Sequence, residues 1–235
     1  MSRGIFITGT DTGVGKTLVA VALLQALKDT GSRVGGMKPV AAGAGGPESA
    51  LFNEDVGLIA SVTGQNPRNR SLNPYFLRDP LSPNIAADNA GISIDIDYIV
   101  GEFRELQRNY EFVVAEGAGG WHCPITHGRT MADVAVALRL PVLLVVGLRL
   151  GCLNHALLTA EAIRRAGLPL FGWIANPIDP QMLAMPENIA TLTQRLGAVP
   201  LAQLPWSRDR AVIAAAMRPT AARVSALCRD DSLSL

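Results

Sequence analysis

The most constraining feature of the sequence is a glycine-rich segment, Gly9 to Thr17, which reads Gly-Thr-Asp-Thr-Gly-Val-Gly-Lys-Thr. An apolar run, Ile5 to Thr8, precedes it, and a helical pattern of apolar residues, Leu18 to Leu27, follows it. A strand, a glycine-rich turn and a helix that opens on Gly-Lys-Thr form the context of a phosphate-binding P-loop. In such loops, backbone N–H groups and the positive end of the helix hold phosphate oxygens. The segment therefore predicts a nucleoside triphosphate site, with Lys16 on the terminal phosphates and Thr17 on Mg²⁺.

The spacing of this loop departs from the usual P-loop. Five residues separate Gly9 from Gly15 where the usual motif has four, so Thr10 occupies the position of the first glycine. Partitioning ATPases of the same broad superfamily carry a signature lysine at the position of Asp11, which reaches across a dimer to the partner's nucleotide. Asp11 reverses the charge at that position. The motif thus counts against a P-loop switch or partitioning ATPase, which stays the alternative from another functional class.

The composition suits one α/β domain spanning residues 1–235, with 49% hydrophobic and 17% charged residues. The net charge of +1 predicts no strong attraction to nucleic acid or to an anionic membrane. The longest apolar run, Leu140 to Leu148, contains Pro141 and Gly147 and is too short to span a bilayer, so it predicts a buried strand. Met1 leads directly into a strand pattern without a signal peptide, so we expect a cytoplasmic protein.

The cysteines and histidines are few. Cys123, Cys152 and Cys228 include no CxxC pair, which is typical of reduced thiols in a cytosolic protein. His122, Cys123 and His127 lie close in the sequence, so a metal site is one interpretation of this segment. A structural zinc site needs a fourth ligand at a matching spacing. We therefore favour the alternative interpretation, a polar loop over an active site.

Strand-like apolar runs alternate with helical patterns, which predicts parallel strands joined by crossover helices. We expect a P-loop NTPase-like three-layer sandwich, in which a mostly parallel central sheet carries helices on both faces. The predicted strands are 5–8, 34–38, 112–116, 142–146, 171–175 and 199–201. The predicted helices are 16–28, 55–62, 95–108, 131–138, 154–166 and 187–196, with one or two more in the tail from residue 208 to 235. Residues 43–53 and 65–84 are predicted to be long loops near the ligands.

Polar or glycine-rich segments follow each of the predicted strands. In an open parallel sheet, ligands bind beyond the carboxyl ends of the strands. We therefore expect a common site at this edge of the sheet. The segments are Gly9–Thr17, Lys38–Val40, Glu116–Gly120, Gly147–Asn154, Asn176–Pro177 and Leu204–Trp206.

Three charged residues near these ends are candidates for the chemistry. Glu116 ends a predicted strand beside the P-loop, where a carboxylate commonly completes the Mg²⁺ shell, and we favour this interpretation over a helix N-terminal carboxylate or a surface charge. Asp55 lies near a predicted helix start, where an acid also stabilises the helix, so metal binding and this structural role stay open. Lys38 could stabilise anionic charge during transfer or extend along the surface into solvent, and the residues alone do not decide.

The remaining candidates have ordinary structural alternatives. The Asn176 amide could contact an adenine edge, and Pro205 and Trp206 could form a wall for the base. Each of them, taken alone, is more often plain loop chemistry. Asn154 is a natural helix N-cap, a role that does not exclude a substrate contact.

Taken together, these segments resemble the dethiobiotin synthetase family of biotin synthesis. The match runs in chain order from Met1 to about Trp206, and the combination of motifs is specific. The matching segments are Thr8–Thr12 with Gly15–Thr17, Lys38–Ala41, Asn73–Tyr75, Ser82–Pro83, Glu116–Trp121, Leu150–Ala156, Gly172–Asn176 and Pro205–Trp206.

The resemblance implies a homodimeric cyclo-ligase that uses ATP and Mg²⁺ to join CO₂ to 7,8-diaminopelargonic acid. One amine forms a carbamate, ATP phosphorylates it to a carbamic-phosphoric anhydride, and the second amine closes the cyclic urea. The products are dethiobiotin, ADP and phosphate. The resemblance places the substrate site at the dimer interface. An amidotransferase-type ligase of cobyric acid synthesis is a weaker alternative, because 235 residues leave no room for its glutaminase domain.

The resemblance also assigns roles by matching position. The catalytic residues are Lys16, Lys38 and Thr12. The Mg²⁺ ligands are Thr17, Asp55 and Glu116. The nucleotide-binding residues are Gly13, Val14, Gly15, Lys16, Thr17, Leu18, Asp55, Glu116, Gly117, Ala118, Gly119, Asn176, Pro177, Pro205, Trp206 and Ser207. The substrate-binding residues are Lys38, Gly119, Gly120, Gly151, Cys152, Leu153 and Asn154, the last four reaching the substrate's carboxylate end from the partner subunit.

Two positions depart from the family pattern. Gly13 stands where many relatives carry Glu, so an acidic group near the nucleotide or metal is missing. Ala42 stands where relatives often carry Ser, so a hydroxyl contact to substrate is lost. Neither change removes an expected metal ligand or the phosphate-binding lysine.

Overall fold

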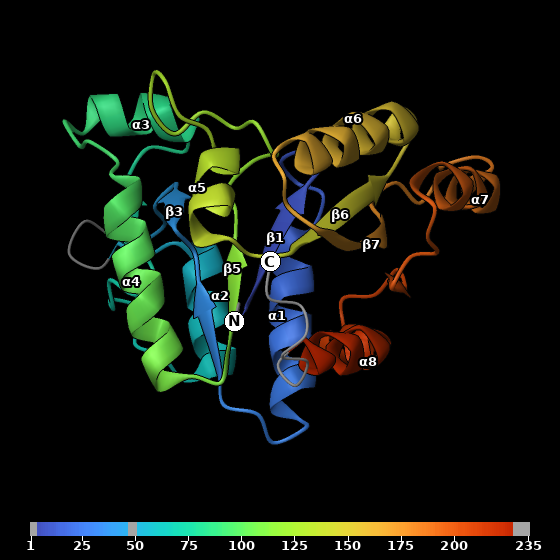
Figure 1. The fold of residues 1–235 in the computed structure, drawn as a ribbon, viewed down its shortest axis with the longest axis horizontal. Coiled ribbons are helices and arrows are strands. Elements are labelled where there is room, and N and C mark those ends of the chain that lie inside the picture. Colours follow the sequence, from blue (N-terminus) through green and yellow to red (C-terminus); the bar gives the residue numbers. More distant parts are fainter. Residues whose placement is uncertain (1–3, 47–50, 228–235) are drawn as a thin grey trace.

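The structure is a computed structural model that describes residues 4–46 and 51–227. The predictions for Cys228 and for the last residues of the tail lie outside the described residues. The fold is α/β (Figure 1). Its central sheet has six strands in the order β2-β5-β1-β6-β7-β8. All of the neighbouring pairs are parallel. The strands are β1 Gly4–Gly9, β2 Val34–Met37, β5 Phe112–Glu116, β6 Val142–Leu148, β7 Leu170–Pro177 and β8 Ala202–Gln203.

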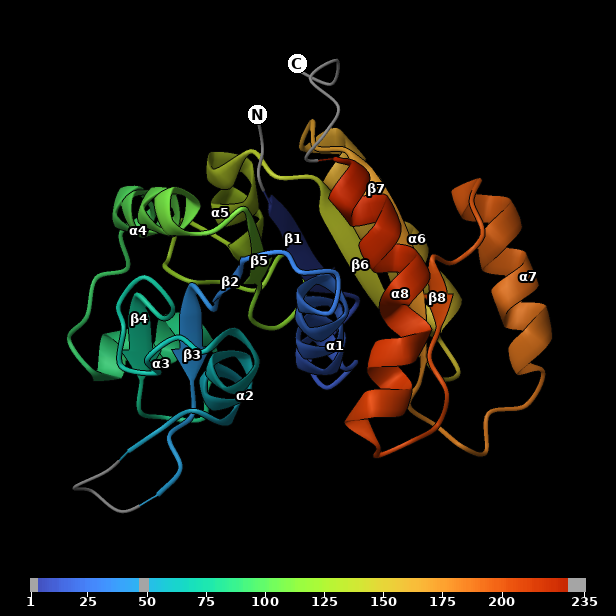
Figure 2. The same ribbon diagram turned by 90° about the horizontal axis from the view of Figure 1, so that it is seen from below.

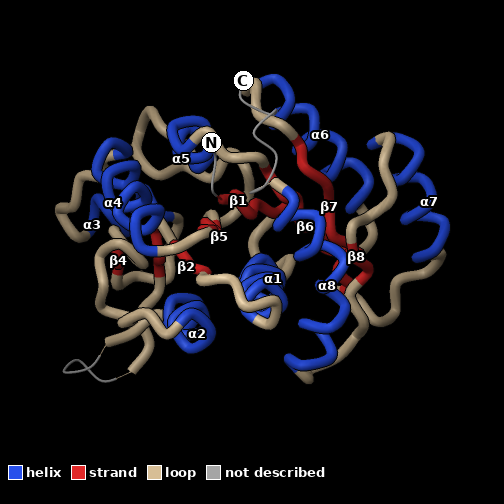
Figure 3. The backbone as a smooth tube through the Cα atoms, turned by 60° about the horizontal axis from the view of Figure 1, so that its bottom comes forward, coloured by secondary structure: helices blue, strands red, loops and turns tan. Residues whose placement is uncertain are grey.

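Helices cover both faces of this sheet, as the alternating pattern predicts (Figure 3). One face carries α1 Lys16–Lys28, α2 Glu54–Thr63 and α8 Arg210–Ala226, which lie next to one another (Figure 2). The other face carries α4 Ile96–Asn109, α5 Met131–Leu138, α6 Cys152–Arg165 and α7 Met185–Leu196. The three-layer prediction is therefore confirmed, and α8 is the helix expected in the tail.

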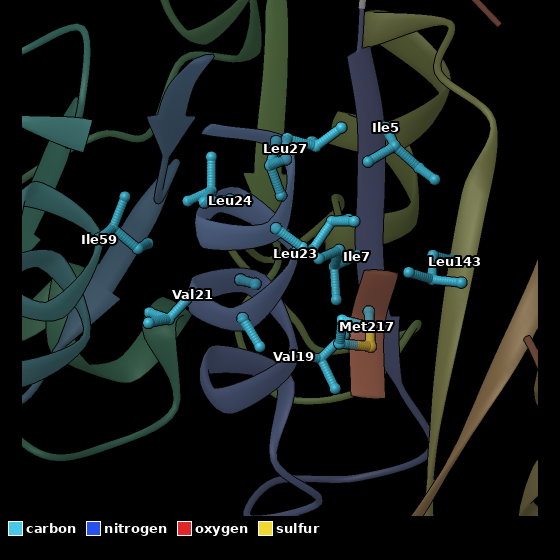
Figure 4. Packing of buried hydrophobic residues seen from close by; sticks show 14 of the residues in the cluster. Ile5, Ile7, Val19, Val21, Leu23, Leu24, Leu27, Ile59, Leu143 and Met217 are labelled. Carbon is cyan, nitrogen blue, oxygen red and sulfur yellow. The ribbon is translucent and has the colours of Figure 1, made fainter. Parts of the chain in front are cut away.

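The helix that follows the P-loop is buried on most of its surface. Leu23 and Leu24 of α1 pack with Ile7 of β1, Ile59 of α2 and Met217 of α8 in one hydrophobic cluster (Figure 4). A helix that contacts a sheet and two further helices is apolar almost all round, which explains the long apolar run after the P-loop. This packing anchors the helix that presents the phosphate-binding loop.

Three short elements differ from the prediction. The small parallel pair β3 Val40–Ala42 and β4 Tyr75–Leu77, and α3 Pro83–Asn89, carry too few residues to give a periodic signal. Strand β4 and the start of α3 lie in the segment 65–84, which was predicted to be a loop, whereas β3 directly follows Lys38 and Pro39. The last strand was predicted at 199–201, which is wrong, because Pro200 has no N–H to donate and Val199 is exposed. Pairing begins where the Leu201 N–H donates to the Trp173 carbonyl at 2.8 Å.

No helix within the described ranges 4–46 and 51–227 is long and apolar enough to cross a membrane.

Candidate active site

The P-loop joins β1 to α1 through a left-handed turn. Gly15, the N-cap of α1, has a φ of 90°, which favours glycine. The Asn176 Nδ2 donates to the Val14 carbonyl at 2.8 Å, and a Cβ on Gly15 would lie 2.2 Å from that nitrogen. Val14 itself is buried, while Thr12 and Gly13 are exposed at the rim of the loop. The loop therefore has a fixed inner wall and an open outer side.

Lys16 lies in this loop and forms no ion pair with an acidic side chain in the part of the chain that the structure describes. Its Nζ donates to the Asp11 carbonyl at 2.8 Å. Burial, and then the positive charge of Lys38, lower the pKa of Lys16 to about 8. A buried ammonium that donates to a neutral carbonyl is stabilised in its charged form when an anion binds beside it. The arrangement suits the binding of phosphate oxygens at the start of α1.

A buried cluster of charges lies beside the P-loop, at the carboxyl ends of β2 and β5. Lys38 Nζ lies 2.6 Å from Glu116 Oε1 and 2.8 Å from Asp55 Oδ2. Glu116 is 0% exposed and Lys38 4%, so the interpretation of Lys38 as a solvent-exposed lysine is wrong. Burial would lower the pKa of Lys38, but Glu116 and Asp55 outweigh it and raise that pKa. Burial would likewise raise the pKa of Asp55, but Lys38 outweighs it and holds that pKa below its ordinary value.

The oxygen atoms of this cluster fit a hard cation. Thr17 donates from its hydroxyl to Glu116 Oε1 at 2.7 Å. Glu116 Oε2 is buried and has no hydrogen-bond partner among the described residues. A carboxylate oxygen that is buried without a partner is costly unless a cation or a donor satisfies it. Carboxylate and hydroxyl oxygens are the ligands that Mg²⁺ prefers, so Thr17, Asp55 and Glu116 form a set that could hold this ion.

The interpretation of His122, Cys123 and His127 as a metal site is not supported. Residues 4–46 and 51–227 contain no group of three or more His, Cys, Asp or Glu side chains that could hold a metal ion. His122, Cys123 and His127 therefore do not form a metal site with one another. The segment is a polar loop, the alternative favoured from the sequence.

Lys38 is held by a residue to which the sequence analysis gave no role. The Asn73 Nδ2 donates to the Lys38 carbonyl at 2.7 Å, and the Lys38 N–H donates to the Leu72 carbonyl at 2.7 Å. Asn73 is itself buried. Its position in the segment Asn73–Tyr75, which the family resemblance includes, was the available signal. The segment before β4 thus fixes the backbone of Lys38 from the outer side of the sheet.

The glycines after β5 face the P-loop and leave little room for a side chain. A Cβ on Gly119, which has a φ of 60°, would lie 2.6 Å from Cys123 Sγ, and Thr12 Oγ1 lies 3.7 Å from the same point. A Cβ on Gly120 would lie 3.6 Å from the Gly9 carbonyl. Gly117 packs against Met131, and Ala118 is partly buried in the same cluster. The structure thus brings Gly119 and Gly120 against the P-loop, whereas Gly117 packs against Met131 and Phe6.

The predicted adenine contacts lie at the ends of β7 and β8. Asn176 is buried and binds the P-loop backbone with its amide nitrogen, while Pro177 ends β7. The Leu204 N–H donates to the Ala175 carbonyl at 2.9 Å, which places the segment 205–207 next to Asn176. Trp206 is 62% exposed in this segment. Leu18 instead lines a pocket between α1, α2 and α8, so its side chain packs away from the phosphate end of the helix.

The predicted substrate loop follows β6 and leads into α6. Its cap differs from the prediction: Gly151, with a φ of 95°, is the N-cap, and Asn154 lies inside the first turn of the helix. The helix begins earlier than predicted because the left-handed Gly151 turns the chain directly after β6. Cys152 is buried in a core cluster with β6 and β7, Leu153 packs against it, and Asn154 is exposed. Cys152 can therefore meet a ligand through its backbone but not through its thiol.

An ion pair joins this segment to the P-loop. Arg149 Nη2 lies 2.5 Å from Asp11 Oδ2. Asp11 therefore neutralises an arginine of the same chain. No role was predicted for Arg149 from the sequence, although its position directly after the apolar run Leu140 to Leu148 placed it at the ligand edge of the sheet.

The chain is similar to a family of known proteins over most of its length. The model of a family described as "AAA domain" matches residues 3–211. The chain is 48% identical to the ATP-dependent dethiobiotin synthetase BioD of Nitrosospira multiformis, over 89% of this chain and 91% of that protein. It is 45% identical to the enzyme of the same name from Aromatoleum aromaticum, over 92% of this chain and 97% of that protein.

Solved structures with the same fold include cell-division ATPases. The MinC:MinD complex of Aquifex aeolicus matches with a TM-score of 0.60 at 17% identity, over 99% of this chain and 98% of the other. MinD of Pyrococcus horikoshii, solved with Mg-ADP, matches with a TM-score of 0.59 at 18% identity, over 97% of each chain. At this identity the likeness shows the fold alone, and it confirms the predicted P-loop NTPase-like architecture.

Proposed function

The chain belongs to the dethiobiotin synthetase family of ATP-dependent ligases, and from this premise we propose that it converts 7,8-diaminopelargonic acid, CO₂ and ATP into dethiobiotin, ADP and phosphate. The observation that carries the proposal is the buried Lys38 at the P-loop, held between Glu116 and Asp55. A cation fixed at this point is suited to the anionic carbamate and to the phosphoryl group that it receives.

The reaction divides into three steps that balance. One amine of the substrate attacks CO₂ and loses a proton, which gives a carbamate. A carbamate oxygen then attacks the γ-phosphorus of ATP, the bond to the bridging oxygen breaks, and ADP leaves. The second amine attacks the carbamate carbon, inorganic phosphate leaves, and the loss of a proton completes the cyclic urea. Phosphorylation supplies the leaving group that a carbamate lacks.

The protein contributes mainly by positioning and by neutralising charge, which is what phosphoryl transfer requires. In our proposal the backbone from Gly13 to Leu18 and the Lys16 ammonium hold the triphosphate. Lys38 stabilises the carbamate and the transferring phosphoryl group, and Thr12 lies where substrate and phosphate meet.

Thr17, Asp55 and Glu116 would hold Mg²⁺, and the unpartnered Glu116 Oε2 supports this assignment. When bound, Mg²⁺ neutralises charge on the phosphate oxygens. Because Lys38 contacts both carboxylates, it would have to yield part of its contacts to the ion. The buried cluster therefore links metal binding to the position of the lysine.

We place the rest of the ligands at the neighbouring strand ends. Adenine would lie against Asn176, Pro177 and the segment Pro205–Ser207, and the chain from Gly117 to Gly120 would lie along the nucleotide and the substrate. The carboxylate end of the substrate would meet Gly151 to Asn154 of a second protomer, which gives a homodimer a functional reason. A cytoplasmic location follows from the metabolic role.

The proposal is tested by ADP release from Mg-ATP with and without diaminopelargonate and bicarbonate. We expect ADP release to require the diamine, and an analogue with one amine to give no cyclic product, because the ring needs the second nucleophile. The Lys16→Ala variant should fold and lose about three orders of magnitude or more in rate, since it lacks the charge at the phosphates. ADP release that ignores the diamine would sink the proposal and favour a switch-type ATPase.

A further inference from the structure

Arg149 and Asp11 form an ion pair that the proposed catalytic roles do not use. Arg149 Nη2 lies 2.5 Å from Asp11 Oδ2. Asp11 belongs to the P-loop, whereas Arg149 directly follows β6 and precedes the segment Gly151–Asn154. The pair therefore connects the P-loop of one site to the segment that, in our proposal, binds the substrate at the partner protomer's site.

On the P-loop side, each oxygen of Asp11 has a donor. Oδ1 accepts the Thr12 N–H at 2.7 Å, Oδ2 accepts the Arg149 guanidinium, and the carbonyl accepts Lys16 Nζ at 2.8 Å. An exposed ion pair usually contributes little because two mobile side chains must be ordered. Here the backbone has already fixed the carboxylate, so the arginine is ordered against a rigid partner.

On the substrate side, Leu150 and Gly151 are exposed, and the chain is next anchored at Cys152, which is buried in the core cluster of β6 and β7. The Arg149 carbonyl accepts the Cys152 N–H at 3.0 Å, which closes the turn into α6. The Leu150 side chain is 92% exposed, and a Cβ added to Gly151 would meet no atom within 4 Å. The P-loop has further supports, because the Thr10 N–H donates to the Val145 carbonyl at 3.1 Å and Asn176 binds Val14. Loss of the ion pair should therefore loosen the turn at Leu150 and Gly151, which leads into the Gly151–Asn154 segment, more than the P-loop.

We propose that Arg149 is a positioning residue. Asp11 orients the Arg149 guanidinium, and this ion pair holds the Gly151–Asn154 segment in a fixed position relative to the P-loop. This inference rests on the proposed function, since it assumes that the segment binds the carboxylate end of the diamine. A segment that is already ordered loses less conformational entropy when the substrate binds, so the substrate binds more tightly. The pair thus acts on diamine binding and leaves the nucleotide site almost unchanged.

Steady-state kinetics of Asp11→Asn, Arg149→Gln and the double variant test this role. We expect each single variant to raise KM for diaminopelargonate about tenfold, with KM for ATP within about twofold of wild type. The double variant should be no worse than either single one, because the two residues act through one contact. Arg149→Lys should recover part of the loss, and Arg33→Gln, which breaks an exposed ion pair with Glu111 at the opposite edge of the sheet, should match wild type. Additive losses, or equal losses for ATP and diamine, would overturn the proposal.

Hydrogen exchange gives a readout that does not depend on the reaction. The Cys152 and His155 amides donate to the carbonyls of Arg149 and Gly151. We expect these amides to exchange faster in Arg149→Gln and in Asp11→Asn, with the Val19 amide of α1 unchanged. Unchanged protection of Cys152 and His155 in both variants would overturn the positioning role even if the wild-type enzyme makes dethiobiotin. Faster exchange in an enzyme that ignores the diamine would support the contact and contradict only the proposed function.

Discussion

At the scale of single residues, Lys16 makes nucleotide binding depend on pH. Its pKa of about 8 lies below the ordinary 10.5 because burial and Lys38 disfavour the ammonium. Phosphate binding needs the protonated form, so above pH 8 the free protein must take up a proton when ATP binds. We expect binding at pH 9 to be about tenfold weaker than at pH 7, with proton uptake visible by calorimetry in buffers of different ionisation enthalpy.

The Lys16→Arg variant is the matched control for this pH dependence. A guanidinium stays protonated throughout this range, so the dependence of ATP affinity on pH should disappear, whatever the affinity of the variant itself. The stability of the fold depends on pH in the opposite sense. Between pH 8 and 10.5 Lys16 is protonated to a greater extent in the unfolded state than in the folded state, so the free energy of unfolding increases as the pH rises. An equal slope in both proteins would show that another group causes it.

The ion pairs of Lys38 with Asp55 and Glu116 should contribute to the stability of the fold. Glu116 is fully buried, so Lys38→Met leaves a buried charge without its counter-charge. We expect a loss of about 3–5 kcal/mol in the free energy of unfolding, measured in urea. The double variant Lys38→Met with Glu116→Gln removes both charges and should be more stable than Lys38→Met alone. A loss below about 0.5 kcal/mol for Lys38→Met would contradict the buried-pair geometry.

The sequence predicted individual residues well where a motif gave their surroundings. The P-loop residues and the carboxylate at the end of β5 follow from local patterns. The ion pairs of Lys38 do not follow from local patterns, because Asp55 and Glu116 lie 17 and 78 positions away from it in the chain. Asn73 and Arg149 were missed for the same reason: their hydrogen bonds depend on which strands lie side by side.

At the scale of elements, the P-loop turn depends on the contact between Gly15 and β7. Gly15→Ala forces a side chain into a left-handed φ and against the Asn176 amide that holds Val14. We expect nucleotide affinity to fall at least about tenfold, since backbone strain of this kind costs on the order of 1–3 kcal/mol. Binding can be measured by titration with a non-hydrolysable ATP analogue.

Gly167→Ala is a suitable control for this change. Gly167 also has a positive φ, of 77°, but a Cβ there meets no atom within 4 Å, and the residue lies after α6. This variant should lose some stability and keep its nucleotide affinity. If Gly15→Ala bound the analogue as tightly as Gly167→Ala does, the Asn176 contact would have no bearing on the loop.

The helices were easier to predict than the short strands. Helix α1 and helix α5 match their predicted ranges, because long amphipathic or apolar runs have clear ends. Strand β8 has two residues and is defined by pairing with β7, which no local pattern reveals. The start of α6 was misplaced because a left-handed glycine, rather than a side-chain cap, begins the helix.

At the scale of the whole molecule, the proposed homodimer can be tested by mixing inactive variants. Lys16→Ala removes a phosphate contact, and Asn154→Asp places a negative charge where the substrate carboxylate should bind. If each site combines a P-loop with the partner's Gly151–Asn154 segment, a mixed dimer has one intact site. Random mixing after dissociation should then recover about a quarter of wild-type activity. No recovery, in mixtures whose exchange is verified by mass, would place the whole site within one protomer.

The measurement that tests the central claim most directly follows carbon and phosphate in one reaction. The protein is supplied with Mg-ATP, diaminopelargonate and ¹³C-bicarbonate, and the products are quantified by mass spectrometry and by an ADP assay. We expect labelled dethiobiotin to form in equal amount to ADP, and neither product to form with the Lys16→Ala variant. Formation of ADP without the labelled cyclic urea would contradict this expectation.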